Sequence, residues 1–340
     1  MKIRRLEDIG TDAWNAAAGA TPDGSFFHLA EWEPVIRQNF RFESQYLAVE
    51  DATGIIGVLP LFIVKRGPLG TTLMSTPLCV VGGAAAFQPE AATFLEEAAM
   101  ARAKVLGVDY LELRNTHRHL DGWQAHEQFF SFTRPILDTE DANFKAIPQK
   151  QRADVRKALA LGLTAGTTRE IEPFYSLYAD SMHRMGTPAY PKKYIQSLIA
   201  IFGDRAEVVF VENQGRPLCA MLCFHFKNRI LPYYAGAISE AYSSYAYTFM
   251  FWSAVKRGLA LGFDMADFGR SIRGTGSFDF KKNWGMERQP LFYQTYLVRG
   301  RAHPTMDPAS LRFRVFSNTW KRLPRFVVDG LSPLASRLVV

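Results

Sequence analysis

The chain has 340 residues, and 40 Lys and Arg against 33 Asp and Glu give it a formal net charge of +7. At roughly 150 residues per domain this length predicts two domains, and a hydrophobic content of 48% excludes a largely disordered chain. The three cysteines, Cys79, Cys219 and Cys223, give neither a disulfide framework nor the C-x-x-C spacing of a zinc site, which indicates a reducing compartment.

The N-terminal half reads as mixed α and β structure. Its first eight residues carry charge but no apolar core follows them, so no signal peptide is predicted. No run of about 18 apolar residues predicts a membrane helix. We therefore expect a cytoplasmic protein, with attachment to the inner membrane surface as the alternative. Apolar spacing and turn residues predict helices over 12–18, 29–38 and 89–106, and strands over 45–49, 55–64 and 110–114.

A basic segment, 141–165, follows and is predicted to form a helix at the junction between two domains. Between Phe144 and Lys157 it carries five Lys and Arg against one Asp. Pro148 suits the start of a helix better than its middle.

The second half repeats the order of the first. We expect helices over 172–185, 192–201 and 247–261, and strands over 206–212, 217–226, 230–235, 266–269 and 294–298. The helix–Gly–strand segments beginning at Gly107 and Gly262 align, which is weak internal symmetry at about 155 residues. The sequence therefore predicts two similar α/β domains, over 1–140 and 166–300, joined by 141–165 and followed by a tail, 301–340.

The tail is basic and amphipathic, with seven Lys and Arg against two Asp. One interpretation is a helix packed on the second domain with a solvated basic face. Another is a segment that lies on anionic lipid, and a third is a nucleic-acid contact. The spacing alone leaves these three open.

The most unusual stretch is 267–285, which leaves a predicted strand through three glycines and ends in Lys281, Lys282 and Trp284. Glycine backbone N–H groups can approach an anion closely, and Arg and Lys supply countercharge, so a phosphate-bearing ligand is one hypothesis. A turn held by Arg–carboxylate pairs is the other. His183 beside the Gly186–Pro188 break, and the aromatic run 231–237, are further candidates, with structural hydrogen bonding and core packing as alternatives. No metal-ligand spacing is found.

Five blocks in order resemble one family. The blocks are Gly186–Pro188, Leu231–Gly236, Asp267–Ser271, Gly274–Gly276 and Phe280–Gly285, with Phe26-Phe27-His28, Trp32 and Leu59–Leu61 as weaker matches in the first half. They resemble the FemAB-like members of the GNAT (acetyltransferase-type) superfamily, and in particular the subgroup associated with exosortase/PEP-CTERM exopolysaccharide loci.

The resemblance covers about residues 1–300 and implies a mixed α/β fold of tandem GNAT-like domains facing each other across a cleft, with a C-terminal helical tail. It implies an acyl- or aminoacyl-transferase that acts on an amine of a cell-envelope polysaccharide or a peptidoglycan-like, lipid-linked precursor. The co-substrate would be acyl-CoA or aminoacyl-tRNA, with no tightly bound cofactor, no metal and no DNA. A non-catalytic glycan-binding adaptor at the membrane surface stays open.

The candidate site residues fall into three roles. Asp267 or His183 would take a proton, and Tyr233 and Tyr234 would position the acceptor, with Tyr234 also counted as catalytic. Phosphate or uronate groups would be held by Arg270, Lys281 and Lys282, helped by Lys150, Arg152 and Arg156. The remaining candidates for substrate binding come from the glycine-rich stretch and the matched blocks, and they are Ser271, Gly274, Thr275, Gly276, Trp284 and Thr187.

Overall fold

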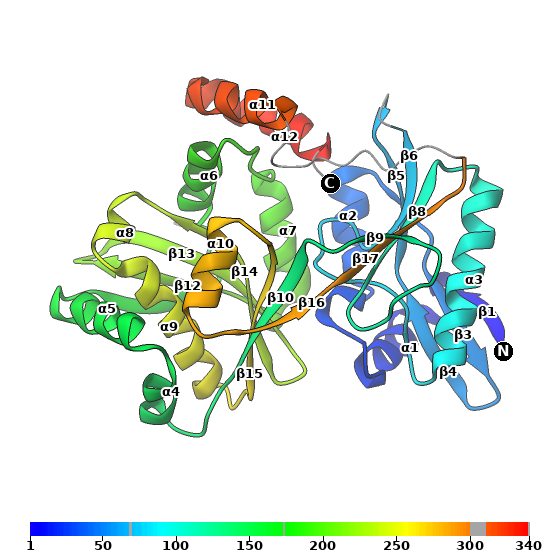
Figure 1. Cartoon of the computed structure of the whole chain (residues 1–340), viewed down its shortest axis with the longest axis horizontal. Coiled ribbons are helices and arrows are strands. Elements are labelled where there is room, and N and C mark those ends of the chain that lie inside the picture. Colours follow the sequence, from blue (N-terminus) through cyan, green and yellow to red (C-terminus); the bar gives the residue numbers. More distant parts are fainter. Residues whose placement is uncertain (68–69, 173, 300–310, 339–340) are drawn as a thin grey trace. The chain divides into compact units, whose positions relative to one another are not determined.

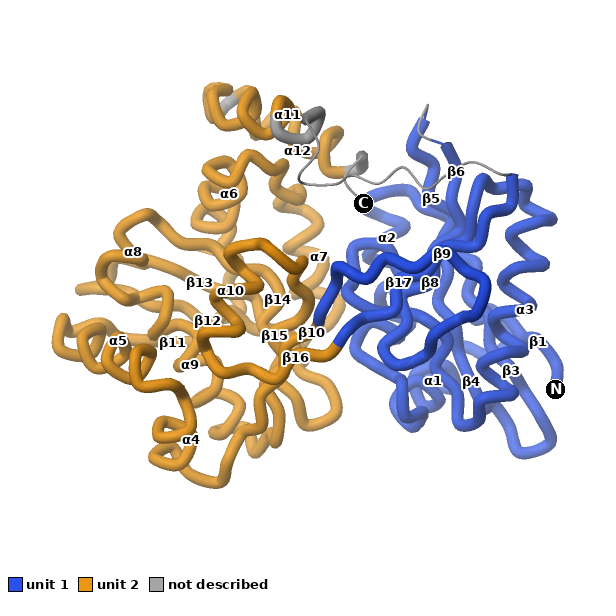
Figure 2. Tube along the Cα trace, in the orientation of Figure 1, with its two compact units in different colours: residues 1–130, 290–305, 340 blue, residues 131–289, 306–339 orange. Residues whose placement is uncertain are grey.

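The computed structural model describes residues 1–67, 70–172, 174–299 and 311–338 (Figure 1). The chain forms two compact units, coloured separately in Figure 2. Within the described residues, unit 1 comprises 1–130 and 290–299, and unit 2 comprises 131–289 and 311–338. Each unit is described by itself below.

Unit 1 contains a four-stranded sheet of order β1-β3-β4-β7 and a six-stranded sheet of order β2-β5-β6-β8-β17-β9. Its strands are β1 (Lys2–Arg5), β2 (Glu43–Ser44), β3 (Leu47–Asp51), β4 (Gly54–Leu59), β5 (Leu61–Lys65), β6 (Thr71–Ser75), β7 (Ala85–Ala86), β8 (Tyr110–Asn115), β9 (Gln124–His126) and β17 (Phe292–Leu297). Its helices are α1 (Leu6–Ala20), α2 (Trp32–Phe40), α3 (Pro89–Leu106) and a 3-10 turn (Phe26–His28).

Local sequence signals set several of these boundaries. The strands predicted over 45–49 and 55–64 are joined by a hairpin between β3 and β4, in which Asp51 pairs with Gly54. The helix predicted over 89–106 is confirmed, and Gly107 ends it at a φ of +60° that favours glycine. The single strand predicted over 55–64 was wrong, since Pro60 separates β4 from β5 and the two join different sheets. Proline has no N–H to give to a ladder.

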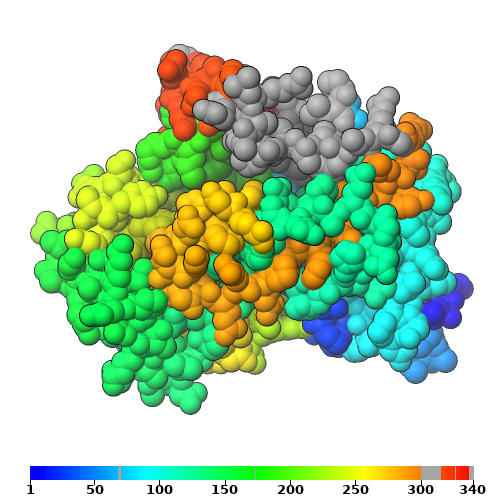
Figure 3. Space-filling view, viewed as in Figure 1, coloured from blue at the N-terminus to red at the C-terminus, as the bar shows by residue number. Residues whose placement is uncertain are grey.

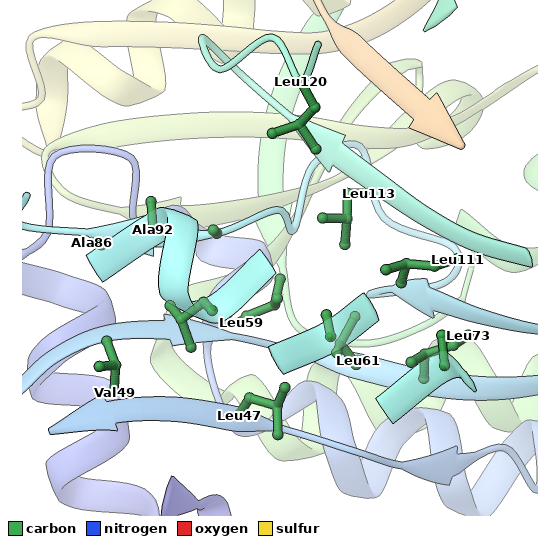
Figure 4. Close-up of a cluster of buried hydrophobic side chains, with 14 of the residues drawn as sticks. Leu47, Val49, Leu59, Leu61, Leu73, Ala86, Ala92, Leu111, Leu113 and Leu120 are labelled. Carbon is green, nitrogen blue, oxygen red and sulfur yellow. The ribbon is translucent and has the colours of Figure 1, made fainter. Parts of the chain in front are cut away.

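The core of unit 1 is aliphatic (Figure 4). Leucines from β3, β5, β6 and β8 meet alanines of α3, whose small side chains let the helix approach the strands closely. Leu61, Leu73 and Leu111 have no exposed surface. Truncation of one such leucine to alanine costs about 2–5 kcal/mol, so this cluster fixes α3 against the sheet.

The Phe26-Phe27-His28 block with Trp32 is held by hydrogen bonds within unit 1. Ser25 donates its backbone N–H to Nδ1 of His28 over 3.1 Å, so Nε2 carries the proton and donates to the carbonyl of Gly83 over 2.9 Å. Trp32 Nε1 donates to the carbonyl of Phe26 over 3.0 Å. All donors and acceptors named here lie within unit 1, so this block holds the N-terminal segment to the 82–83 loop.

Unit 2 contains a seven-stranded sheet of order β11-β12-β13-β14-β15-β10-β16. Its strands are β10 (Phe129–Pro135), β11 (Thr164–Thr168), β12 (Ala206–Asn213), β13 (Arg216–Phe226), β14 (Arg229–Ala237), β15 (Met265–Ile272) and β16 (Glu287–Pro290). Its helices are α4 (Glu140–Ala146), α5 (Gln149–Ala160), α6 (Phe174–Met185), α7 (Lys192–Phe202), α8 (Glu240–Ser243), α9 (Ala246–Ala260), α10 (Gly276–Asn283), α11 (Leu311–Arg322), α12 (Arg325–Leu338) and a 3-10 turn (Gly203–Arg205).

The two units share one pattern around a long helix. In unit 1, β6 and β8 are parallel neighbours with α3 between them in sequence, and in unit 2, β14 and β15 are parallel neighbours with α9 between them. Gly107 and Gly262 follow the two helices, both at positive φ. This is the helix–Gly–strand symmetry seen in the sequence.

Strand pairing moves the unit boundaries away from the predicted 140 and 300. β10 joins the sheet of unit 2 beside β15, while β17, from much later in the chain, joins the sheet of unit 1 between β8 and β9. The single helix predicted over 141–165 was also wrong. Pro148 divides it into α4 and α5, and 164–168 is strand β11.

The tail contains two helices, α11 and α12, that contact α6 near the top of Figure 1. Ser317 donates to the carbonyl of Met185, and Arg325 forms an ion pair with Asp180. At Gly186, an added Cβ would lie 2.5 Å from the carbonyl oxygen of Ser317, which explains the glycine. Packing of the tail on the second domain is confirmed for these residues, whereas 301–310 lie outside the described residues. In the described part of the chain, none of the helices combines the length and the hydropathy needed to cross a bilayer.

Candidate functional site

All of the candidate site residues lie in unit 2. In the sheet of this unit, β14 and β15 begin as a parallel pair and then separate. Their pairing consists of Arg229 with Met265 and Ile230 with Ala266, at the start of both strands. Beyond these pairs the two strands carry Tyr233, Tyr234, Asp267 and Arg270. Ligands of open α/β sheets bind beyond the carboxyl ends of strands, so the separation marks a candidate site.

A β-bulge redirects the side chains of β14. Leu222 pairs with Tyr234 and Cys223 pairs with Pro232, so Tyr233 is the extra residue of the bulge. Ile230 lies against Gly258 of α9, whereas Tyr234 contacts Tyr178 of α6. An unbroken strand would place both on one face, and the extra residue moves Tyr234 to the other.

A tyrosine cluster surrounds Tyr234. Its hydroxyl lies 3.1 Å from that of Tyr194, and its ring centroid lies 5.7 Å from those of Tyr178 and Tyr190. Burial, followed by the neighbouring phenols, raises the pKa of Tyr234 well above its usual value. The hydroxyl therefore stays protonated at neutral pH and serves as a hydrogen-bonding group, which fits the predicted positioning role better than proton abstraction.

Asp267 of β15 and Lys281 of α10 interact electrostatically, and Asp267 is half-buried whereas Lys281 is buried. One carboxylate oxygen of Asp267 accepts the backbone N–H of Gly269 over 2.9 Å. Burial raises the pKa of Asp267, and the opposing effects of that N–H, Arg229 and Lys281 do not cancel the rise. A carboxylate with a raised pKa is better matched to accepting a proton near neutral pH.

Lys281 projects from α10 into the backbone of β15. Its Nζ donates to the carbonyls of Phe268 at 2.5 Å, Arg270 at 3.1 Å and Gly269 at 3.3 Å, and the residue is 9% exposed. Burial lowers its pKa to about 7, against the raising effect of Asp267. An ammonium has three donors, and all three face carbonyls. The predicted role of Lys281 as a phosphate ligand was therefore wrong, and the side chain fixes the end of β15.

The glycine-rich stretch is the turn between β15 and α10. Thr275 caps α10 by accepting the backbone N–H of Phe278, and Gly274 has a φ of +81°. Gly276 is the first residue of the helix. Ser271 is buried, and its hydroxyl accepts from that of Ser277 over 3.0 Å. These residues make a capped strand-to-helix turn.

The cations near this turn differ in exposure. Arg270 and Lys282 are exposed, unlike Lys281. Trp284, predicted to bind substrate, has no exposed surface and packs against Phe251 of α9. The predicted role of Trp284 in substrate binding was wrong, because its side chain is part of the hydrophobic core.

The basic residues of α5 divide in the same way. Lys150 is exposed, whereas Arg152 donates to the carbonyls of Lys145 and Ile147 and so closes the end of α4. The guanidinium of Arg156 lies over the ring of Phe144, 5.2 Å from its centroid. Arg152 and Arg156 thus hold α4 in place, and Lys150 is exposed to solvent.

His183 and Thr187 lie where α6 ends. Within the ranges that the structure describes, His183 Nε2 is buried without a hydrogen-bond partner. Thr187 donates its backbone N–H to the carbonyl of Met182 over 3.0 Å and continues the helix end past Gly186. His183 therefore has an uncommitted nitrogen, which keeps it as a second proton acceptor in the proposal below.

Two arrangements were missed from the sequence. The first is the remainder of the tyrosine cluster, whose signal is the i, i+3 and i, i+4 spacing of Tyr175, Tyr178, Tyr190 and Tyr194. The second is the buried carboxylate of Glu207, which accepts from Arg257 on α9 and lies 2.9 Å from Nε2 of His225. Burial raises the pKa of Glu207, but the bonds from His225 and Arg257 outweigh this and lower it.

Two further features lie apart from these residues. A cavity of about 530 Å³ in unit 1 is lined by none of the candidate site residues. Among the described residues, no three His, Cys, Asp or Glu side chains gather as they would around a metal ion.

The comparisons with known proteins concern the fold and the family of the second half of the chain. Residues 149–282 match the family model described as "Acetyltransferase (GNAT) domain", a range that includes Tyr234, Asp267 and Lys281. The structure is similar to the crystal structure of FemX, with a TM-score of 0.71 and 15% identity over 88% of this chain and 98% of the other.

The chain has a tandem GNAT-like fold. It is also similar to a tandem GNAT protein from the clavulanic acid biosynthesis pathway, with a TM-score of 0.54 and 12% identity over 88% of this chain and 99% of the other. L-PGS from Bacillus licheniformis gives 0.56 and 10% identity over 93% and 98%. No curated protein sequence matches the chain.

Proposed function

We propose that the protein is an acyl- or aminoacyl-transferase that acts on an amine of a cell-envelope polysaccharide or a lipid-linked, peptidoglycan-like precursor, in the cytoplasm. The GNAT family match over 149–282 and the FemX-like fold support transfer to an amine. The observation that carries the proposal is the half-buried carboxylate of Asp267, with its raised pKa, where β15 leaves β14.

The reaction needs no covalent enzyme intermediate. The acceptor amine attacks the carbonyl carbon of the donor, a C–N bond forms, and the C–O bond of an ester or the C–S bond of a thioester breaks. The amine proton passes to Asp267 and then to the departing oxygen or sulfur. His183 is the alternative acceptor of that proton.

The surrounding residues position the reactants. Tyr233 and Tyr234, at the bulge, contact the acceptor, and exposed Arg270 and Lys282 bind its phosphate or uronate groups together with Lys150. Lys281 keeps Asp267 in place by holding three consecutive carbonyls of β15. Lys281 is thus a positioning residue.

An experiment has to decide between acyl-CoA and aminoacyl-tRNA as the donor, because the similar structures do not single out one of them. The tandem GNAT protein of clavulanic acid biosynthesis is described as a structure without AcCoA, which names an acyl-CoA beside that fold. Another similar structure, from Agrobacterium fabrum with a TM-score of 0.55, is the C-terminal domain of a putative lysylphosphatidylglycerol synthetase. Aminoacyl-tRNA and acyl-CoA are therefore both tested as donors. The five matched sequence blocks favour a role in exopolysaccharide production at exosortase/PEP-CTERM loci.

The test is product formation by Asp267→Asn with each donor and an amino-sugar acceptor. Losing a general base lowers kcat by about 10²–10⁴-fold. The Asp279→Asn variant, which makes the same exchange at an exposed carboxylate of α10, is the matched control and keeps kcat within a few fold. Full activity of Asp267→Asn with loss of activity in His183→Gln would move the base to His183. No product from the unaltered protein with either donor would favour the glycan-binding adaptor instead.

A further inference from the structure

The helix α12 buries its less apolar face. Val328, Ser332 and Ser336, four residues apart, are 3%, 4% and 1% exposed. Leu331 and Leu334 are 44% and 65% exposed. As far as the structure describes the chain, the buried hydroxyl of Ser332 has no hydrogen-bond partner. A helix that served only to cover the protein would place its leucines inward and its serines outward.

The exposed leucines form a continuous stripe. Val327, Leu331 and Leu334 stand at i, i+4 and i+7, which is one face of a helix. The preceding helix α11 behaves similarly, since Val315 and Phe316 are 57% and 37% exposed while Trp320 is 4% exposed. The orange-red atoms of this C-terminal part lie on the molecular surface in Figure 3.

The sequence of α11 and α12 carries almost only positive charge. Residues 311–338 contain six Lys and Arg and a single acidic residue, Asp329. Asp329 is paired with Arg325, which also contacts Asp180 of α6. Lys321 and Arg322 are exposed, and Arg322 follows Val315 by seven residues, which places it on the same helix face.

We propose that the outward face of α11 and α12, formed by Val315, Phe316, Lys321, Arg322, Leu331 and Leu334, docks on an anionic lipid bilayer. Aliphatic side chains enter the boundary between headgroups and acyl chains, and the cations remain at the anionic surface. A protein partner of matching chemistry would need an acidic surface with an apolar centre, whereas anionic lipid supplies both everywhere. The proposal does not depend on the transferase reaction.

The test is sedimentation of the full chain with vesicles of phosphatidylcholine alone and of phosphatidylcholine with 30% phosphatidylglycerol, at 50 and 300 mM salt. We expect binding to the anionic vesicles that weakens at high salt. Lys321→Gln/Arg322→Gln should bind about 25-fold more weakly, at about fivefold per cation. Leu331→Ser/Leu334→Ser should bind about 30-fold more weakly, because about one leucine equivalent no longer leaves water.

The matched control is Leu159→Ser/Leu161→Ser, which removes two leucines that are each 53% exposed on another helix end. It should bind as the unaltered chain does. The Lys321→Gln/Arg322→Gln variant changes only exposed side chains and keeps the test valid if the leucine variant does not fold. The proposal is overturned if the unaltered chain does not bind anionic vesicles, or if both variants bind them as the unaltered chain does. It is also overturned if the chain is a dimer in solution and Leu331→Ser/Leu334→Ser dissociates that dimer.

Discussion

Replacing Lys281 with methionine should change how the stability of the protein depends on pH. The side chain is 9% exposed, and its pKa falls from its ordinary 10.5 to about 7 on folding. Between these two values the unfolded chain binds a proton at this amine that the folded chain lacks. The free energy of unfolding therefore rises with pH across that range and levels off above the unfolded pKa.

The expected size follows from the two pKa values. The linkage relation gives a rise of about 2 kcal/mol in the free energy of unfolding between pH 7 and pH 9 from this one group. Lys281→Met has no such group, so the stability difference between variant and unaltered protein should shift by that amount. The variant also leaves three carbonyls of β15 without their donor, which lowers stability equally at both pH values.

Urea unfolding at pH 7 and pH 9 measures this shift. Lys282→Met, which removes an exposed amine from the same helix, should show no such change between the two pH values. An equal stability difference between Lys281→Met and the unaltered protein at both pH values would refute the assignment of a lowered pKa.

Two further predictions concern packing in unit 2. Arg257→Met leaves the buried carboxylate of Glu207 without its guanidinium and should cost about 3–5 kcal/mol by urea unfolding at pH 7. Because the pKa of Glu207 is lowered on folding, this cost is present above its unfolded pKa and should shrink as the pH falls through its folded value; a constant cost would contradict the prediction. Gly236→Ala places a Cβ 2.2 Å from the backbone nitrogen of Tyr178 and should lower the thermal midpoint by several degrees, while Gly276→Ala, whose Cβ meets nothing within 4 Å, should leave it nearly unchanged.

Local signals predicted most helices and strands, and the failures involve contacts distant in sequence. The helix at 89–106 was found with its cap because Pro89 and Gly107 mark both ends. In unit 2 the strands β10, β11 and β16 were missed, since their place in the sheet depends on partners elsewhere in the chain. The short strands β1, β2, β7 and β9 of unit 1 were missed as well. Pro60 separates β4 from β5, and Pro148 separates α4 from α5. The effect of Pro60 on strand pairing was underestimated.

Burial decides which of the predicted site residues the structure contradicts. Asp267 and the Tyr233–Tyr234 pair were proposed from the sequence, and their roles stay predictions. Burial, which no local pattern reveals, made Trp284 a core residue and turned the ammonium of Lys281 toward carbonyls. The tyrosines of α6 and α7 were overlooked because their meeting requires the tertiary fold.

The exchange of β10 and β17 between the two sheets also constrains biosynthesis. A ribosome that has released residues 1–130 has released only part of the six-stranded sheet of unit 1, because the strand between β8 and β9 comes from residues 292–297. Until then, β8 presents an unpaired edge to its surroundings, and such edges promote association with other chains. Truncated versions that stop before residue 298 should therefore aggregate even when the whole of the N-terminal segment is present.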